Sequence, residues 1–300
     1  MRAAKPLLGD NMLEIVIYGT VNSAVLAVMA LGFAMVYGVS RLPNFAHGAL
    51  YVLTGYATWT LMNKFGVSYG LAIPLSLIAV SCVGALIYHF LLIRVRGMPL
   101  SEIMASFAIG LAIMEALRWW GFIGEAYILP PLVRGVIDIG GVPIDLQRLL
   151  IVGVGAALVA FLWFFTLYTK VGLALSAVAQ DERAAMMLGM DSDFTATAAM
   201  AFGSALAGIG AVVILPLGNI TVETGYEVLI YAVAVAAIGG LGSWFGAILA
   251  AFLLGFAQII TVVFLAPQYQ VVVVFLAIIL TFIVRPSGLF GRQKQLEERV

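Results

Sequence analysis

The chain has 300 residues, of which 63% are hydrophobic and only 10% are charged. A soluble domain has roughly 45 to 50% apolar and about 25% charged residues, so this composition excludes a water-soluble globule and makes lipid the main solvent. The formal net charge is zero and Cys82 is the single cysteine. The sequence therefore indicates no polyanionic partner and excludes an internal disulfide or a thiolate metal site.

Apolar segments follow one another along the whole chain. A bilayer core about 30 Å thick needs about 20 apolar helical residues, and nine segments between charges and Gly or Pro breaks approach this length. They cover residues 12–38, 44–63, 69–93, 99–121, 149–169, 194–216, 228–243, 246–265 and 270–284. The second and seventh are short and are either spans or re-entrant elements, which leaves eight spans as the alternative.

These segments predict an all-α polytopic integral membrane protein with eight or nine transmembrane helices. Short or broken helices are expected near residues 40–48 and 239–246. No segment is long and polar enough for a separate soluble domain, so residues 1–300 are expected to form one membrane-spanning domain. The first apolar segment is too long and too acidic for a cleaved signal peptide and is expected to remain as a helix.

Basic residues predict the orientation, because Lys and Arg are retained on the cytoplasmic side during insertion. The tail, residues 285–300, is basic and is placed in the cytoplasm. Alternation of nine spans then places the N-terminus outside. The residues inside are Arg41, Arg94, Arg96, Lys170, Arg183, Arg285, Arg292, Lys294 and Arg299; those outside are Arg2, Lys5, Lys64, Arg118, Arg134 and Arg148.

Small residues recur at every fourth position in three consecutive spans. In lipid the hydrophobic effect does not drive helices together, so such ridges indicate close helix packing. The ridges are Ala199, Gly203, Ala207 and Ala211; Ala232, Ala236 and Gly240; and Ala247, Ala251 and Gly255. We interpret these ridges as helix-packing surfaces and not as part of a functional site.

Two helix breaks resemble each other, at residues 44–50 and 242–248. Each reads as a break, an aromatic residue, Gly-Ala and then a helix. Asn44 and Ser243 are the expected N-caps, whose side chains would accept from the free amides of the helix that follows. Transporters often place such broken helices near the substrate site. An internal repeat and a chance likeness both remain open.

The residues that a membrane enzyme or a self-contained pump needs are missing from the sequence. His47 and His89 are its only histidines, and neither belongs to a metal-binding motif. The G-x-S-x-G match at residues 66–70 lies in a short loop between spans and not on a strand-to-helix turn. There is no G-x-x-x-x-G-K-[ST] motif, so an ATP site must belong to another chain.

Few charges lie within the apolar segments, although such charges usually mark an ion path. Glu115 and Arg118 are three residues apart and are expected to form a structural pair near the outer end of the fourth span. The lack of further buried carboxylates weakens the case for proton or sodium coupling.

The loop between the fifth and sixth spans, residues 170–193, is predicted to be cytoplasmic. Between Gly172 and Gly189 it consists of good helix formers with a charged patch and a small apolar patch. This pattern is typical of a short surface helix that a partner protein contacts. An amphipathic helix lying on the membrane is the alternative that these residues leave open.

Within this loop, Arg183-Ala184-Ala185-Met186-Met187-Leu188-Gly189 resembles the E-A-A-x-x-x-G coupling motif of ABC importer permeases, with Arg in the Glu position and Glu182 just before it. The stretch from Gly172 to Met190 resembles the corresponding loop of the branched-chain amino-acid permeases of the LivH class, except that Leu173 and Ser176 stand where many members carry basic residues. Three further blocks resemble the same family in the same order: Asn44-Phe45-Ala46-His47-Gly48 with Leu50 and Gly55, Ile238-Gly239-Gly240-Leu241-Gly242-Ser243 with Gly246-Ala247, and Arg285-Pro286-Ser287-Gly288-Leu289-Phe290-Gly291.

The resemblance implies a multi-pass permease subunit of the bacterial inner membrane. Its implied partners are a second homologous permease, two ATP-binding subunits that hold the ATP, and a periplasmic substrate-binding protein; no cofactor is expected on this chain. The residues implied for ATPase coupling are Asp181, Glu182, Arg183, Ala184, Ala185 and Gly189, and those expected along the substrate pathway are Asn44, Phe45, His47, Gly239, Gly240 and Ser243.

The family's cargo ranges over branched-chain and other amino acids, urea and amides, and aromatic or other small acids, and nothing in this sequence selects among them. An ATP-independent secondary transporter or channel is the rival function. An integral-membrane enzyme is not supported, because the sequence carries no catalytic constellation.

Overall fold

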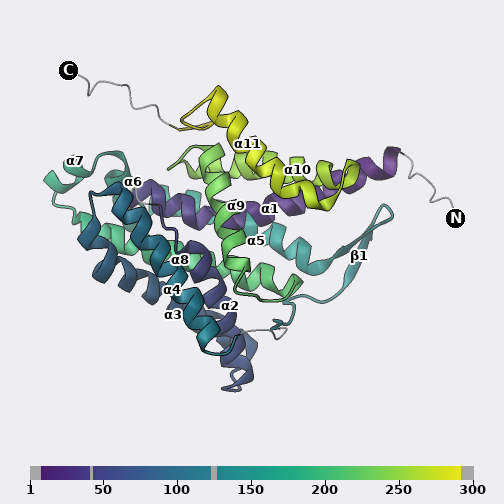
Figure 1. Ribbon diagram of the computed structural model, residues 1–300, viewed down its shortest axis with the longest axis horizontal. Helices are drawn as coiled ribbons and strands as arrows, with labels where there is room; N and C mark the ends of the chain where they lie inside the picture. The colour runs from purple at the N-terminus through teal and green to yellow at the C-terminus, as the bar shows by residue number, and fades with distance from the viewer. Residues whose placement is uncertain (1–7, 41–42, 123–126, 292–300) are drawn as a thin grey trace.

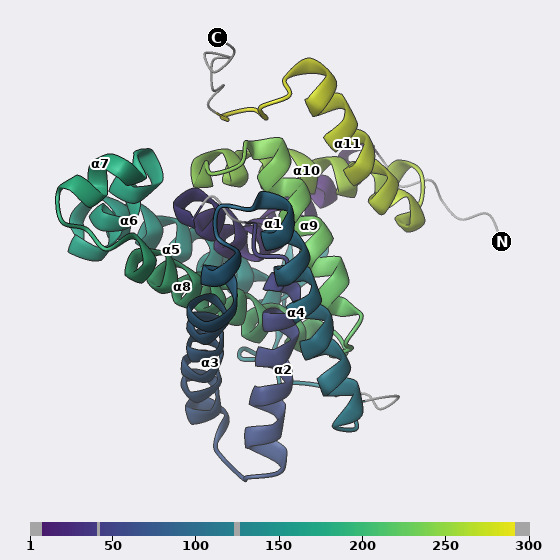
Figure 2. The ribbon, with the colours of Figure 1, turned by 60° about the vertical axis from the view of Figure 1, so that its left-hand side comes forward.

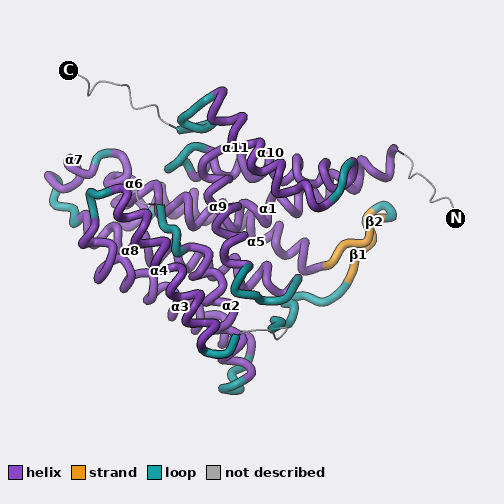
Figure 3. Tube along the Cα trace, in the orientation of Figure 1, coloured by secondary structure: helices purple, strands orange, loops and turns teal. Residues whose placement is uncertain are grey.

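A computed structural model describes residues 8–40, 43–122 and 127–291. Arg41, Arg2, Lys5, Arg292, Lys294 and Arg299, which the sequence assigned to the two membrane faces, lie outside the described residues. In the described residues the chain folds as helices, most of them joined by short connections, and the longer connection between α4 and α5 carries a small hairpin (Figures 1 and 3). The elements are α1 (Leu8–Ser40), α2 (His47–Asn63), α3 (Tyr69–Leu86) with its continuations η1 (Ile87–Leu91) and η2 (Leu92–Val95), α4 (Pro99–Trp119), β1 (Val136–Ile139), β2 (Val142–Asp145), α5 (Leu146–Tyr168), α6 (Lys170–Gln180), α7 (Glu182–Met187), α8 (Ser192–Ile214), η3 (Leu215–Leu217), α9 (Thr224–Gly239), α10 (Trp244–Phe264), η4 (Pro267–Tyr269) and α11 (Gln270–Val284).

Seven helices in the described part of the chain are long and apolar enough to cross a membrane. The predicted all-α polytopic fold is confirmed, but the predicted count of eight or nine spans is wrong. The difference lies in α2 and α9, with 17 and 16 residues. At 1.5 Å per residue these helices are about 26 and 24 Å long, which is less than a bilayer core of about 30 Å. They correspond to the two segments that the sequence marked as short.

The molecule has two distinct ends. Helices α6 and α7 lie at one end and the β1–β2 hairpin at the other (Figure 1). Helix α1 begins at the hairpin end, where the Tyr18 hydroxyl donates to the Pro143 carbonyl at 3.0 Å. The start of α1 and the α6–α7 connection therefore lie at opposite ends of the molecule. The membrane sides of these two ends remain a prediction from the basic residues.

The hairpin was missed by the sequence analysis. Its antiparallel strands pair Val136 with Asp145 and Ile139 with Val142. The turn uses Gly140 and Gly141, whose φ angles of +63° and +91° are left-handed conformations that glycine adopts without strain.

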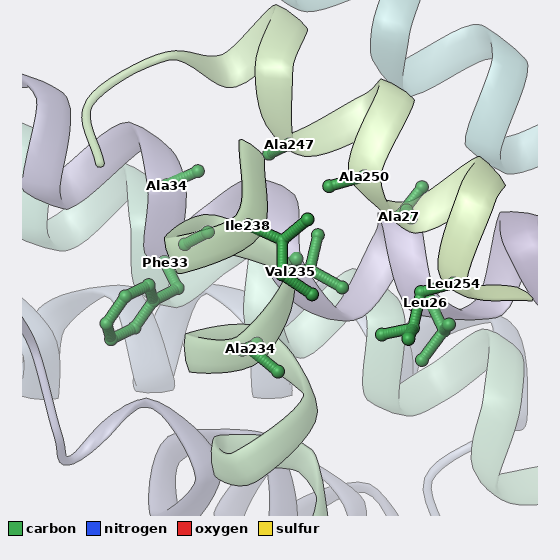
Figure 4. Packing of buried hydrophobic residues seen from close by; sticks show 14 of the residues in the cluster. Leu26, Ala27, Phe33, Ala34, Ala234, Val235, Ile238, Ala247, Ala250 and Leu254 are labelled. Atoms are coloured by element: carbon green, nitrogen blue, oxygen red, sulfur yellow. The ribbon is translucent and has the colours of Figure 1, made fainter. Parts of the chain in front are cut away.

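Helix α1 is the centre of the bundle, since its residues contribute to each of the four described hydrophobic clusters. In the largest cluster, α1 packs against the small residues of α9 and α10 (Figure 4). The predicted small-residue ridges of α8, α9 and α10 are buried in the bundle: Ala199, Ala207, Ala211, Ala232, Ala236, Ala247 and Ala251 are all almost completely buried. Their interpretation as packing surfaces is confirmed.

The crossing of α1 and α10 combines close approach with polar contacts. The Asn22 side-chain amide donates to Gln258 Oε1 at 2.8 Å, and the Ser23 hydroxyl donates to the Phe252 carbonyl at 3.1 Å. A Cβ atom added to Gly255 would lie 2.6 Å from the backbone Cα of Ser23. The helices can approach this closely only because residue 255 has no side chain.

We predict that Gly255→Ala destabilises the protein, because the new methyl group must push the backbones of α1 and α10 apart. Overpacking of this kind typically costs about 1 to 3 kcal/mol. The matched control is Gly153→Ala in α5, where an added Cβ meets nothing within 4 Å. Thermal unfolding of the two variants in lipid nanodiscs should show a lower midpoint for Gly255→Ala alone; equal midpoints would contradict the packing analysis.

Candidate functional site

The connection between α5 and α8 forms two short helices at one end of the molecule (Figure 2). The sequence predicted a single surface helix between Gly172 and Gly189, and this is wrong. Asp181 has an extended backbone (φ −150°) and ends α6, while its carboxylate accepts from the Ala184 amide at 3.1 Å and begins α7. The helix breaks there because an aspartate side chain competes for backbone amides.

Helix α7 ends in a tight glycine turn. The Met190 amide donates to the Ala185 carbonyl at 3.1 Å, and the Gly189 amide donates to the Met186 carbonyl at 3.0 Å. This is the Schellman arrangement, which requires a left-handed residue after the helix. Gly189 supplies it with a φ of +83°. Gly189 therefore shapes the end of α7, at the position where the sequence placed the end of the helix-forming stretch.

The residues expected at the coupling surface divide between the two faces of α7. Ala185 is buried against the bundle, and the Glu182 carboxylate also turns inward. Arg183 and Ala184 are exposed. Met187 and Leu188 are 87% and 78% exposed, and Met186 beside them is also exposed. The outer face of α7 is therefore an apolar tip of three residues next to a small residue and a positive charge.

Arg96 holds the inner face of α7. It lies just after η2 and donates to Glu182, to Asp193 and, at 2.6 Å, to the Ser192 hydroxyl, which itself donates to Glu182 Oε1 at 2.7 Å. Burial on its own would lower the pKa of the Arg96 guanidinium, but Tyr88, Glu182 and Asp193 raise the pKa above its ordinary value. In the sequence, Arg96 is only an orientation signal, and no pattern there indicates this cluster.

A second group of expected site residues precedes α2. Asn44 was expected to cap this helix, and this is wrong, because α2 begins at His47 with Ala46 as its N-cap. The Asn44 Oδ1 atom accepts instead from the Ala46 amide at 3.0 Å, within a turn before the helix. The Phe45 amide donates to the Ser106 hydroxyl of α4 at 3.3 Å. This turn therefore lies inside the bundle against α4.

His47 and Asn44 are both buried, and each has one side-chain nitrogen without a partner in the described part of the chain. His47 Nε2 lies 2.9 Å from the Met29 carbonyl of α1, so Nε2 carries the hydrogen of this contact. His47 Nδ1 and Asn44 Nδ2 are the unpartnered atoms. The described residues contain no group of three or more His, Cys, Asp or Glu side chains that could hold a metal ion.

The third group lies at the break between α9 and α10. Gly239 ends α9, and Gly240 and Gly242 have φ angles of +101° and +88°. The Ser243 hydroxyl accepts from the Gly246 amide at 3.0 Å, so the predicted N-cap of α10 is confirmed. The break leaves the last carbonyls of α9 without partners in their own helix.

The segment after α11 supplies those partners. The Leu289 and Phe290 amides donate to the carbonyls of Ile238 and Gly239 at 2.8 and 2.9 Å. Gly288 has a φ of +77° and a Cβ added there would lie 2.5 Å from the Gly240 Cα atom. Two of the four blocks that carried the family resemblance are therefore in direct contact.

At the hairpin end, Arg118 joins two segments. It donates to Glu115 on its own helix, as predicted, and to Glu223 before α9 at 2.9 Å. This hydrogen bond holds the pKa of the Glu223 carboxyl below its ordinary value. Close by, the Tyr56 hydroxyl donates to the Ile220 carbonyl at 3.2 Å and anchors the segment that leads into α9.

These features define a polytopic helical membrane protein with interrupted helices in its bundle and an exposed, anchored helix at one end. Residues 15–282 match the family described as the permease component of branched-chain amino acid transport systems. The chain belongs to this family and is a multi-pass membrane permease subunit that works with other subunits of an ABC importer.

Relatives cover almost the whole chain. It is 29% identical to the high-affinity branched-chain amino acid transport system permease protein BraD of Pseudomonas aeruginosa, covering 94% of this chain and 96% of BraD. It is 27% identical to the LivH permease protein of Escherichia coli, covering 91% and 94%. The solved structure of PsaBC from Streptococcus pneumoniae in complex with Fab has a similar fold, with a TM-score of 0.53, 13% identity and coverage of 95% and 98%.

We predict that Gly288→Ala releases the tail from the end of α9, because its methyl group would meet Gly240 and the Ala237 carbonyl. Hydrogen exchange should become at least tenfold faster at the Leu289 and Phe290 amides. Gly141→Ala is the matched control, since its φ is also left-handed (+91°) but nothing lies within 4 Å of the added Cβ. Unchanged exchange in Gly288→Ala would show that the contact with Gly240 does not hold the tail.

Proposed function

We propose that this chain forms half of the transmembrane pathway of an importer for branched-chain or related amino acids, next to a second homologous permease. Two ATP-binding subunits supply the energy, and a periplasmic binding protein delivers the solute. Family membership supports the permease role, and the branched-chain amino acid transport systems to which the relatives belong support the cargo class.

The exposed apolar tip of α7 is the observation that carries the coupling proposal. Met186, Met187 and Leu188 lie beyond the last charged residues of a short helix at the end assigned to the cytoplasm. Side chains of this kind are stabilised when a partner buries them, at about 25 cal/mol for each Å² of apolar area. We assign the ATP-binding subunit as that partner, with Arg183 and Ala184 at the edge of the contact.

The shape of α7 suits the transmission of a movement. It is only six residues long, it is capped by Asp181 and closed by the Gly189 turn, and its inner face is attached to the bundle. A shift of the ATP-binding subunit against the tip would move α7 as one body. The helices that it joins, α6 and α8, would follow.

The substrate pathway is assigned to the interface of the two permeases, along Asn44, Phe45, His47, Gly239, Gly240 and Ser243. The interrupted helices at these residues support the assignment, because the free amides of a helix N-terminus favour a carboxylate. Asn44 and His47 are buried within the subunit in the described conformation. The proposal therefore requires the turn before α2 to become accessible during transport.

We predict that Met187→Glu lowers ATP-dependent uptake at least tenfold, because docking would bury a carboxylate in an apolar contact. Met187→Leu, which keeps the apolar volume, is the matched control and should retain uptake within twofold. Uptake by proteoliposomes that contain the whole importer measures both variants, with membrane insertion checked by immunoblot. Full uptake by Met187→Glu would rule out docking through the tip.

The rival function, transport without ATP, makes a different prediction. Reconstituted without its partners, the chain should not accumulate leucine against a gradient, whereas the complete importer with ATP should do so. The comparison uses one lipid mixture and radiolabelled leucine. Accumulation by the isolated chain would show that it is a secondary transporter.

A further inference from the structure

We infer that Arg96 is a positioning residue that fixes α7 to the bundle and links the movement of α7 to the turn before α2. The inference rests on the proposed function, because it assigns a route by which docking at α7 reaches the pathway. Arg96 is 86 residues from Glu182 and 97 residues from Asp193 along the chain. It therefore connects the end of α3 to the first residue of α7 and the start of α8 through charged groups that are far apart in the sequence.

The contacts of Arg96 are specific for a guanidinium. One nitrogen, Nη1, donates to Asp193, and the other, Nη2, donates to Glu182 and to the Ser192 hydroxyl. A planar fork serves acceptors on two helices at once, whereas the ammonium of a lysine is a single point charge. The Arg96 side chain is only 22% exposed, while Glu182 and Asp193 are 45% and 52% exposed. The cluster thus anchors the first residue of α7, and the docking tip lies at the other end of this helix.

The connection continues from Arg96 into the bundle. The amide of Gly97, the next residue, donates to Glu102 Oε1 of α4 at 2.6 Å. Glu102 is 2% exposed and lines a small internal cavity together with Pro43, Asn44 and Tyr88. Asn44 Nδ2 and the Tyr88 hydroxyl have no hydrogen-bond partner in the described part of the chain.

This cavity joins the start of α4 to the turn before α2. Two unpartnered polar groups and a carboxylate belong to residues that line it, so a small displacement can bring them into new hydrogen bonds. A displacement of α7 would move Arg96 through its contact with Glu182, and then Glu102 through its hydrogen bond with the Gly97 amide. The structure thus provides a series of contacts from the docking helix through Arg96, Gly97 and Glu102 to α4, whose Ser106 hydroxyl accepts from the Phe45 amide at 3.3 Å in the turn before α2.

The first test measures coupling in the complete importer. Arg96→Ala should reduce the amount of leucine taken up per ATP hydrolysed at least fivefold. Arg94→Ala is the matched control, because Arg94 carries the same charge in the same segment but is exposed; its coupling ratio should stay within twofold of the wild type. Arg96→Lys should fall between them. A ratio for Arg96→Ala equal to that of Arg94→Ala would overturn the inference.

A double-variant comparison separates a direct link from general damage. If Arg96 acts through Glu182, the variant Arg96→Ala with Glu182→Gln should be no worse than the poorer single variant. Losses that multiply would show that the two residues act independently and would contradict the inference. If Arg96→Ala does not assemble, Glu182→Gln carries the same comparison with the Arg94→Ala control.

The second test follows the turn before α2. In a Cys82→Ser background, Pro43→Cys should be labelled by a thiol reagent at rates that differ at least threefold with and without ATP. Arg96→Ala should remove this difference, which a role confined to folding would not do. An ATP-dependent difference that persists in Arg96→Ala would overturn the proposed route.

Cross-linking distinguishes the failure of this inference from the failure of the proposed function. Met187→Cys in the Cys82→Ser background should cross-link to the ATP-binding subunit in the assembled importer. If it does and Arg96→Ala leaves coupling unchanged, docking stands and the route through Arg96 is wrong. If it does not, the docking proposal is wrong and the route falls with it.

Discussion

The fold depends on one constraint, which is that lipid cannot satisfy the hydrogen bonds of an exposed backbone. The chain nevertheless interrupts its helices inside the bundle, before α2 and between α9 and α10. Each interruption is enclosed by protein that supplies the missing partners. The turn before α2 bonds to Ser106 of α4, and the last carbonyls of α9 accept from the Leu289 and Phe290 amides of the tail. The tail is therefore part of the bundle up to the end of the described residues.

Features governed by local chemistry were predictable from the sequence. Apolar length located the seven long helices, and the small-residue ridges located their contacts, because both follow from the periodicity of a helix in lipid. A polar side chain at a helix end can, however, accept a hydrogen bond from any of several nearby backbone amides. Ser243 caps the helix that follows it. The Asn44 side chain instead accepts from the Ala46 amide, before α2 begins at His47. Asp181 divides a stretch that the sequence predicts as one helix into two helices. A side chain that can accept from several nearby amides does not reveal which one it will choose.

Features that depend on distant partners were not predictable. Arg96, Ser192 and Asp193 show no pattern in the sequence that connects them, and the tail gives no sign that its amides meet the end of α9. The family resemblance identified the blocks at Asn44, Gly239, Arg183 and Gly288, but it did not say which of them touch. The structure shows that the tail lies on the α9–α10 break and that α7 is held by a residue outside every one of those blocks.

The end of α3 departs from a regular helix directly before Arg96. Residues Ile87–Leu91 form a π-helical turn and Leu92–Val95 a 3₁₀ turn directly before it. Such irregular turns are common at functional sites because they redirect the chain. Here they bury Tyr88 and Leu92 beside Leu50 of α2 and Met200 of α8 and leave Arg96 at the surface beside Glu182. The same hydrophobic cluster thus contacts the start of α2 and the start of α8. A movement of Arg96 with α7 would therefore displace side chains such as Tyr88 and Leu92, which lie beside Asn44.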